Sequence, residues 1–108
     1  MILFVSKYLI PKNFRGMTIF PFVILSHKKD KTNEVLIHHE RIHIRQQVEM
    51  LVVLFFIWYG VEFFLRFLQY KNWNLAYRNI SFEREAYSNE NDLNYLKKRS
   101  FWMFLKYI

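Results

Sequence analysis

Two histidines and a glutamate fall within five consecutive residues, His39-Glu40-Arg41-Ile42-His43. On a helix, a spacing of four returns a side chain to nearly the same face, so both imidazoles can reach one metal ion. Zn²⁺ accepts imidazole nitrogens in a tetrahedral shell, and a catalytic site leaves one position for water. Glu40 lies on the flank of the same turn, where its carboxylate can take a proton from that water. The pattern predicts a helix-borne zinc site with Glu40 as general base.

This spacing also arises by chance on ordinary helices, so a third ligand is needed. The chain has no cysteine, which restricts metal ligands to histidine and carboxylate. His27 and His38 have no partner at metal-ligand spacing, and we expect a loop histidine and an ordinary polar side chain there. Residues 79–90, NISFEREAYSNE, offer Glu83 and Glu85 on a second expected helix.

Only one of these two carboxylates can face the metal, because residues two apart on a helix point to different faces. Glu83 shares its face with Ala86 and Glu90, and a small alanine would let two helices approach closely. Glu85 shares its face with the bulky Phe82. The helical geometry favours Glu83 as the third ligand and leaves Glu85 as the alternative.

The two motifs together resemble those of the gluzincin metallopeptidases, whose third zinc ligand is a helical glutamate. His39-Glu40-x-x-His43 followed by Glu83-x-x-Ala86 is similar to the CAAX-prenyl endopeptidase, heat-shock HtpX and antibiotic-sensor peptidases. It is also similar to a compact family of uncharacterised bacterial proteins that retain little beyond this core. The resemblance implies a zinc-dependent peptidase that hydrolyses peptide bonds with zinc-activated water, acting on peptide or protein substrates.

The resemblance covers residues 18–90 and departs from the family at Tyr87, where the relatives carry an aspartate. That aspartate orients a histidine ligand from outside the metal shell. Tyr87 can form a hydrogen bond in the same place but lacks the negative charge. These peptidases also pair an extended substrate with an exposed strand beside the active-site helix, and residues 18–26 are the candidate strand.

The N-terminal part of the site should come from a short sheet. Residues 17–26, MTIFPFVILS, are rich in β-branched and aromatic side chains, which predicts one strand. Pro21 cannot donate to a ladder, so that strand should lie at an edge or begin a bulge. We predict an α+β fold in one zincin-like domain over residues 1–108, with this edge strand, a long active-site helix and a second glutamate-bearing helix.

Two helices must carry the proposed ligands. Thr32 or Asn33 can cap the first, which has room to run over residues 34–70 as one helix or as two that meet near Gly60. The second should begin at Ser81 as its N-cap, with acidic residues in its first turns, where the helix dipole favours negative charge.

An apolar segment begins at Met50 and ends at Leu68. Its uncharged stretch is only about twelve residues long, against the roughly twenty that a membrane span needs. Glu62 and Arg66 interrupt the remainder, although at a spacing of four they could pair with each other. We therefore expect residues 50–68 to pack inside the protein, with membrane contact as the alternative.

The chain carries a net charge of +7 at neutral pH. Its basic residues form no nucleic-acid-binding motif, so we do not expect DNA or RNA partners. The N-terminus lacks the regions of a secretory signal, which predicts a cytoplasmic protein, with association with the inner membrane left open. The alternative function is a non-catalytic zinc-binding or membrane-surface interaction protein.

Overall fold

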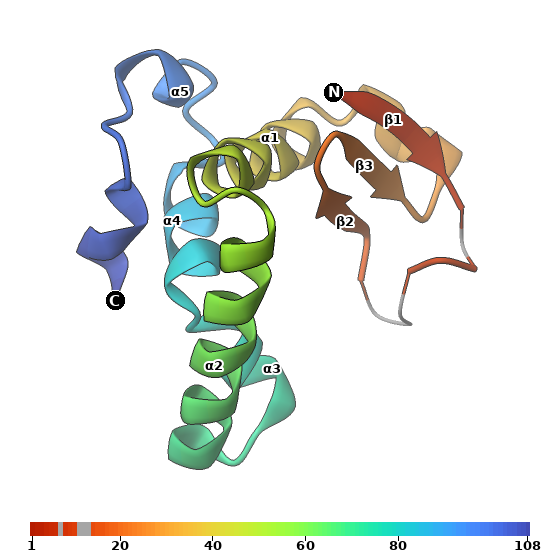
Figure 1. Ribbon diagram of the computed structural model, residues 1–108. Helices are drawn as coiled ribbons and strands as arrows, with labels where there is room; N and C mark the ends of the chain where they lie inside the picture. Colours follow the sequence, from red (N-terminus) through yellow and green to blue (C-terminus); the bar gives the residue numbers. More distant parts are fainter. Residues whose placement is uncertain (7, 11–13) are drawn as a thin grey trace.

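The computed structural model describes residues 1–6, 8–10 and 14–108, and it confirms the predicted α+β class. Figure 1 shows α1 between a small sheet and α4, with α2 running away from them. The described elements, in chain order, are β1 (Ile2–Val5), β2 (Gly16–Ile19), β3 (Phe22–Leu25), the 3₁₀ helix η1 (Lys28–Thr32), α1 (Glu34–Glu49), α2 (Val53–Tyr70), α3 (Trp73–Arg78), α4 (Ser81–Asn89), α5 (Tyr95–Lys98) and the 3₁₀ helix η2 (Met103–Tyr107).

The sheet has three strands in the order β1-β3-β2, with β1 parallel and β2 antiparallel to β3. The single strand predicted over residues 17–26 is wrong, because the chain reverses at Phe20-Pro21 and forms a hairpin. Pro21, which follows a cis peptide bond, lies in the turn, where its missing N–H removes no ladder hydrogen bond. The hairpin leaves β2 at the edge of the sheet, against α1.

The first helix begins where the sequence predicted, since the Asn33 side chain accepts a hydrogen bond from the Leu36 N–H. It ends at Glu49, and a turn over residues 50–52 leads into α2, so the break does not lie near Gly60, which is inside α2. Leu51 and Val52 both adopt positive φ, 56° and 59°. That conformation is unfavourable for a β-branched residue and is not signalled by glycine or proline. Met50, which belongs to this turn, is buried in the aromatic core.

The core around this turn is built from helices far apart in sequence. Met50, Phe55, Ile80, Phe82 and Phe104 are buried against one another. They come from the α1–α2 turn, α2, the start of α4 and η2, so the C-terminal segment lies beside α4, as Figure 1 shows. This cluster fixes α4 relative to α1, which is the pair of helices that carries the predicted ligands.

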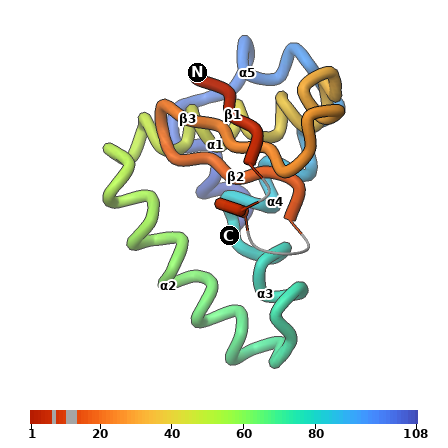
Figure 2. Tube along the Cα trace, turned by 90° about the vertical axis from the view of Figure 1, so that its right-hand side faces the viewer, coloured from red at the N-terminus to blue at the C-terminus, as the bar shows by residue number. Residues whose placement is uncertain are grey.

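The expected burial of residues 50–68 is wrong for most of α2. Within this helix only Phe55 and Glu62 are buried, because a single stripe packs against the core and α3. Figure 2 shows α2 extending away from the sheet. By length and composition it is a helix that could cross a membrane, and no other such helix is found in the described residues. Its large exposed apolar side chains are Val53, Leu54, Phe56, Ile57, Val61, Phe64, Leu65, Phe67 and Leu68.

Glu62 has a structural partner that the sequence did not reveal. Its carboxylate accepts hydrogen bonds from the Ser81 N–H and hydroxyl at 2.5 and 2.7 Å, and from the Trp58 indole at 3.2 Å. Ser81 is therefore the first residue of α4, Ile80 is the N-cap, and the predicted cap is wrong by one position. Arg66 bonds Gln69 and not Glu62. Glu62 thus joins α2 to the positive end of the α4 dipole.

Candidate metal centre

Helices α1 and α4 bring His39, His43 and Glu83 together in the interior. The Glu83 Oε1 atom lies 3.0 Å from His43 Nε2 and 3.2 Å from His39 Nε2, and the two Nε2 atoms are 3.2 Å apart. All three side chains are buried, and their ligand atoms lie within 4.8 Å of one another. Two imidazoles and a carboxylate at this spacing could hold one metal ion, as the sequence predicted.

The tautomer of His43 is set by Gln46, one turn further along α1. The Gln46 amide nitrogen donates to the Phe82 carbonyl at 3.1 Å and to the Glu85 carboxylate at 3.0 Å. The Gln46 side-chain oxygen must therefore face His43 Nδ1, 2.8 Å away, and accept a hydrogen bond from a proton on that nitrogen. In the neutral imidazole the lone pair is then on Nε2, which points at the metal position. From the sequence, Gln46 and Gln47 could either line the cleft or belong to a polar helix face, and the spacing of three from His43 places Gln46 on the same face. The contact of Gln46 with His43 Nδ1 is seen only in the structure.

His39 is oriented by Glu90 and not by Tyr87. The Glu90 Oε2 atom lies 3.3 Å from His39 Nδ1. The Tyr87 ring packs edge-on against the His39 imidazole, with centroids 4.5 Å apart, and its hydroxyl meets Tyr77. Glu90 thus supplies the negative charge that Tyr87 lacks. The sequence held one signal for this role of Glu90, because its spacing of seven from Glu83 places both carboxylates on the same helical face.

Glu85 faces away from the two histidines, which is the consequence of its two-residue offset from Glu83. Its carboxylate is fully buried and pairs with the Arg99 guanidinium, which also reaches Glu49 at 2.6 Å. The Tyr95 hydroxyl donates to it at 2.7 Å. As an alternative ligand Glu85 is therefore misplaced; it acts on the site only through Gln46, as an outer partner of His43.

The Glu40 carboxylate is held against the edge strand. The Thr18 hydroxyl donates to Glu40 Oε2 at 2.5 Å. A Cβ atom on Gly16 would lie 2.8 Å from Glu40 Oε1, closer than ordinary contacts permit, so a side chain at position 16 would displace the carboxylate. Thr18 and Gly16 together fix where Glu40 can stand. The expected role of Glu40 as a base requires this kind of fixed position beside the metal.

Gln47 attaches α1 to the outer edge of β2. Its amide nitrogen donates to the Thr18 carbonyl at 2.7 Å, and its oxygen accepts the Phe20 N–H at 2.6 Å. Across the hairpin, Ser26 N–H donates to the Arg15 carbonyl, so residue 15 faces β3. Backbone groups alternate along a strand, and those of Gly16 therefore point to the open edge. Because Gln47 occupies the Thr18 carbonyl and the Phe20 N–H, the backbone of Gly16 is the part of this edge that another chain can reach.

A cleft of about 270 Å³ opens beside these residues. Glu40, His43 and Glu83 lie in its wall, together with the edge strand and α2. The Tyr59 hydroxyl, from α2, donates to the second oxygen of Glu83 at 2.8 Å. Tyr59 was not singled out from the sequence, because only the packing of α2 on α4 brings it to the site. A metal ion held by these residues would thus be accessible from the cleft, although the three side chains are buried.

Opposite effects of burial and charge set the protonation of the site. Burial by itself lowers the pKa of His43, but the Glu83 carboxylate outweighs it and raises the pKa to about 9. Burial would raise the pKa of Glu83, but His43 and His39 hold it far below its usual range. The metal-free site therefore keeps an ionised Glu83 beside a protonated His43 at neutral pH.

The donor set fits Zn²⁺. Two imidazole nitrogens and a carboxylate oxygen are ligands that zinc commonly takes, and each imidazole has an acceptor at its Nδ1 atom. Tyr59 likewise holds the free oxygen of Glu83. Every predicted ligand is thus oriented by a neighbour outside the ligand set, as in sites built for a metal.

Comparison of the chain with protein-family models, with curated proteins and with solved structures gives no match. The resemblance carried by the two motifs stays a prediction. Its functional meaning therefore depends on the residues and distances of the site itself.

We expect one Zn²⁺ per chain. Glu83→Gln should weaken zinc binding by about 100-fold or more because a charged ligand is lost, and Glu90→Gln by about tenfold because only an orienting partner is lost. The exposed Glu34 at the start of α1 supplies the control, Glu34→Gln, which should bind as the wild type does. Competition with a chelating dye gives the affinities. A wild type that retains no more zinc than a His39→Ala/His43→Ala double variant would exclude the site.

Zinc affinity should rise with pH. Below pH 9 the metal-free site holds a proton on His43, which the metal must displace, so binding requires the loss of that proton. Between pH 7 and 8.5 we expect an increase of about tenfold per pH unit. Calorimetry in buffers of different ionisation enthalpy should count about one proton released. An affinity that does not change over this range would contradict the arrangement at His43.

Proposed function

We propose that the protein is a zinc-dependent peptidase that hydrolyses peptide bonds with an activated water. The observation that carries this proposal is the position of Glu40, whose carboxylate is fixed by Thr18 in the wall of the same cleft as His43 and Glu83. A carboxylate that is held beside a His-His-Glu donor set, but outside it, suits a general base and not a fourth ligand.

When bound, Zn²⁺ would polarise the substrate carbonyl and lower the pKa of a water molecule. Glu40 takes a proton from the attacking water and then gives it to the nitrogen of the leaving amine, so that it ends the cycle ionised. Thr18 holds the carboxylate in place during both transfers. The backbone N–H and C=O of Gly16, at the open edge of β2, are positioned to pair with the backbone of an extended peptide.

Glu40→Gln should abolish turnover while zinc binding remains, because the amide keeps the size of the side chain but cannot accept the proton. We expect a loss of about 100-fold or more in the cleavage of fluorescein-labelled denatured casein. Glu34→Gln, on the same helix but exposed, is the matched control and should cleave normally. Loss of zinc from Glu40→Gln, or full activity in that variant, would contradict the assigned role.

The second candidate function is a non-catalytic zinc protein that acts at a membrane surface. It is favoured by the exposed apolar face of α2, since Ile57, Val61 and Phe64 are each more than half exposed. Contiguous apolar surface of this kind is typical of membrane or partner contact. Membrane contact is compatible with either function, and we propose a cytoplasmic protein that associates with the inner membrane. Peptide cleavage that depends on Glu40 would distinguish the peptidase from the non-catalytic zinc protein.

The apolar face of α2 should hold the chain on membranes. In fractionated cells we expect the wild type in the membrane pellet, and the double variant Ile57→Glu/Phe64→Glu mainly in the soluble fraction, because charge on this face opposes contact with lipid. Leu93→Glu, at an exposed apolar residue outside α2, is the control and should stay with the membranes. Equal pelleting of wild type and double variant, or a wild type that is soluble, would contradict membrane contact through α2.

A further inference from the structure

Two hollows of different character meet at Glu40. One is the cleft of about 270 Å³ described above, and the other has a volume of about 560 Å³. Both are lined by Phe14, Gly16, Glu40 and Tyr77, so they adjoin one another at the general base and at the open backbone of β2. A peptide that paired with Gly16 would extend into one hollow on each side of Glu40.

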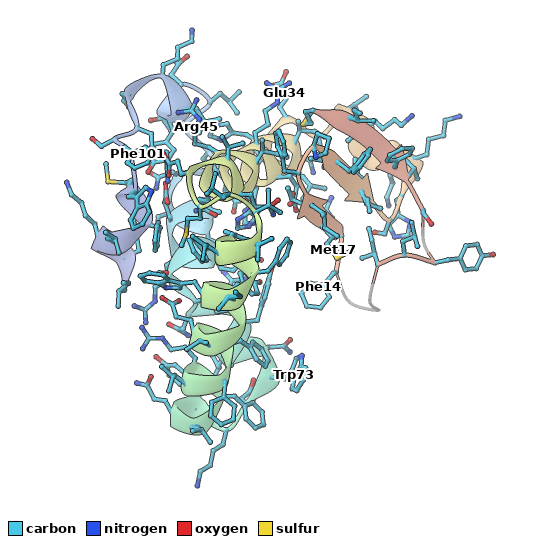
Figure 3. All side chains as sticks on the ribbon, viewed as in Figure 1. Phe14, Met17, Glu34, Arg45, Trp73 and Phe101 are labelled. Atoms are coloured by element: carbon cyan, nitrogen blue, oxygen red, sulfur yellow. The ribbon has the colours of Figure 1, made fainter. Side chains whose placement is uncertain are left out.

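The smaller hollow is walled by apolar side chains. Phe55, Phe56 and Phe63 of α2 form one side, Met17 of β2 the other, and Trp73 of α3 the end. Figure 3 shows Phe14 and Met17 next to each other on the α2 side of the sheet, with Trp73 below them. Phe56 and Trp73 are both substantially exposed. Such a wall gains most from burying a large apolar side chain.

The larger hollow is polar, and two arginines and two glutamates lie in its wall. Its carboxylates are engaged: Glu90 lies against His39, and Glu40 accepts from Thr18. Of its two arginines, Arg15 pairs with Asp30 at 2.7 Å. Arg78 lies over the Tyr87 ring, 4.1 Å from its centroid, and among the described residues it has no carboxylate within ion-pair distance. Arg78 is therefore the positively charged side chain of this hollow that is available to bind an anionic group of a ligand.

We propose that the cleft selects an extended peptide with a large apolar side chain on one side of Glu40 and a carboxylate, recognised by Arg78, on the other. The inference rests on the proposed function, since it treats both hollows as parts of one substrate site. The carboxylate can belong to an acidic side chain or to the C-terminus of the peptide. Guanidinium groups recognise either source by paired hydrogen bonds to the two oxygens.

Binding can be measured without turnover on the zinc-loaded Glu40→Gln variant of the 108-residue chain, purified in mild detergent. The probes are fluorescent nonapeptides with an amidated C-terminus, a central Phe, and Glu, Gln or Lys two positions before or after it. A further probe has Gln there and a free C-terminus two positions after Phe. Fluorescence anisotropy gives each affinity, and the last probe separates a terminal carboxylate from an acidic side chain.

We expect a carboxylate-bearing probe to bind about fivefold more tightly than its Gln counterpart, which is about 1 kcal/mol, and the Lys probe to bind most weakly. Replacing the central Phe of the probe by Ala should cost at least about tenfold. Adding Arg78→Gln should reduce the carboxylate preference to less than about twofold, whereas Arg41→Gln, on the outer side of α1, should retain it.

The apolar hollow has its own matched pair of variants. Phe56→Ala should remove much of the preference for Phe over Ala in the probe, because Phe56 forms part of the wall. Leu65 lies nine residues further along α2, on the opposite face of the helix, and Leu65→Ala should leave the preference intact. Together the two pairs assign one property of the peptide to each hollow.

Equal affinity for the Glu, Gln and Lys probes, or a preference that survives Arg78→Gln, would overturn the inference. Cleavage of casein by the wild type distinguishes this failure from that of the proposed function. Casein cleavage without any charge preference leaves the peptidase standing and removes the inference. The expected order of affinities without cleavage supports the binding inference and removes the peptidase.

Discussion

The buried face of α1 is largely polar, and buried polar groups of this kind need hydrogen-bonding partners. His39, Glu40, His43, Gln46 and Gln47 are all nearly inaccessible to solvent. Most of their partners come from β2 and the turn after it, from α4 and from the residue that follows α4. The sheet and the second helix are therefore held in place by the same contacts that shape the site. A helix of this kind specifies its neighbours by directional bonds, where an apolar face would specify them only by volume.

A second buried cluster supports the first. Arg99 is buried between Glu85 and Glu49, which lie on different helices, and Glu85 in turn holds Gln46 in the orientation that His43 needs. The C-terminal segment is therefore connected to His43, a proposed metal ligand, through two intervening side chains. Breaking one member of such a buried ion cluster leaves an uncompensated charge inside the protein, so the cluster acts as a unit.

The sequence predicted what depends on local periodicity. The spacing of His39 and His43, the cap at Asn33 and the helical face of Glu83 all follow from the geometry of one helix. Contacts between distant residues were not predictable in this way: Glu90 meets His39 across about fifty residues, and Glu62 caps a helix that begins at Ser81. The turn at Leu51 and Val52 was missed because neither residue favours positive φ, and only the packing of the core makes that turn.

The amide of Gln47 has a consequence for association between molecules. A strand at a sheet edge exposes a row of hydrogen-bonding groups, on which another chain can add a strand and begin aggregation. Along the outer edge of β2, Gln47 already takes the Thr18 carbonyl and the Phe20 N–H. An incoming strand could pair with the backbone of Gly16, but the Thr18 carbonyl and the Phe20 N–H are already occupied. The hydrogen-bonding groups that remain are too few to continue the sheet. The side chain that anchors the strand to α1 therefore also protects this edge from self-association.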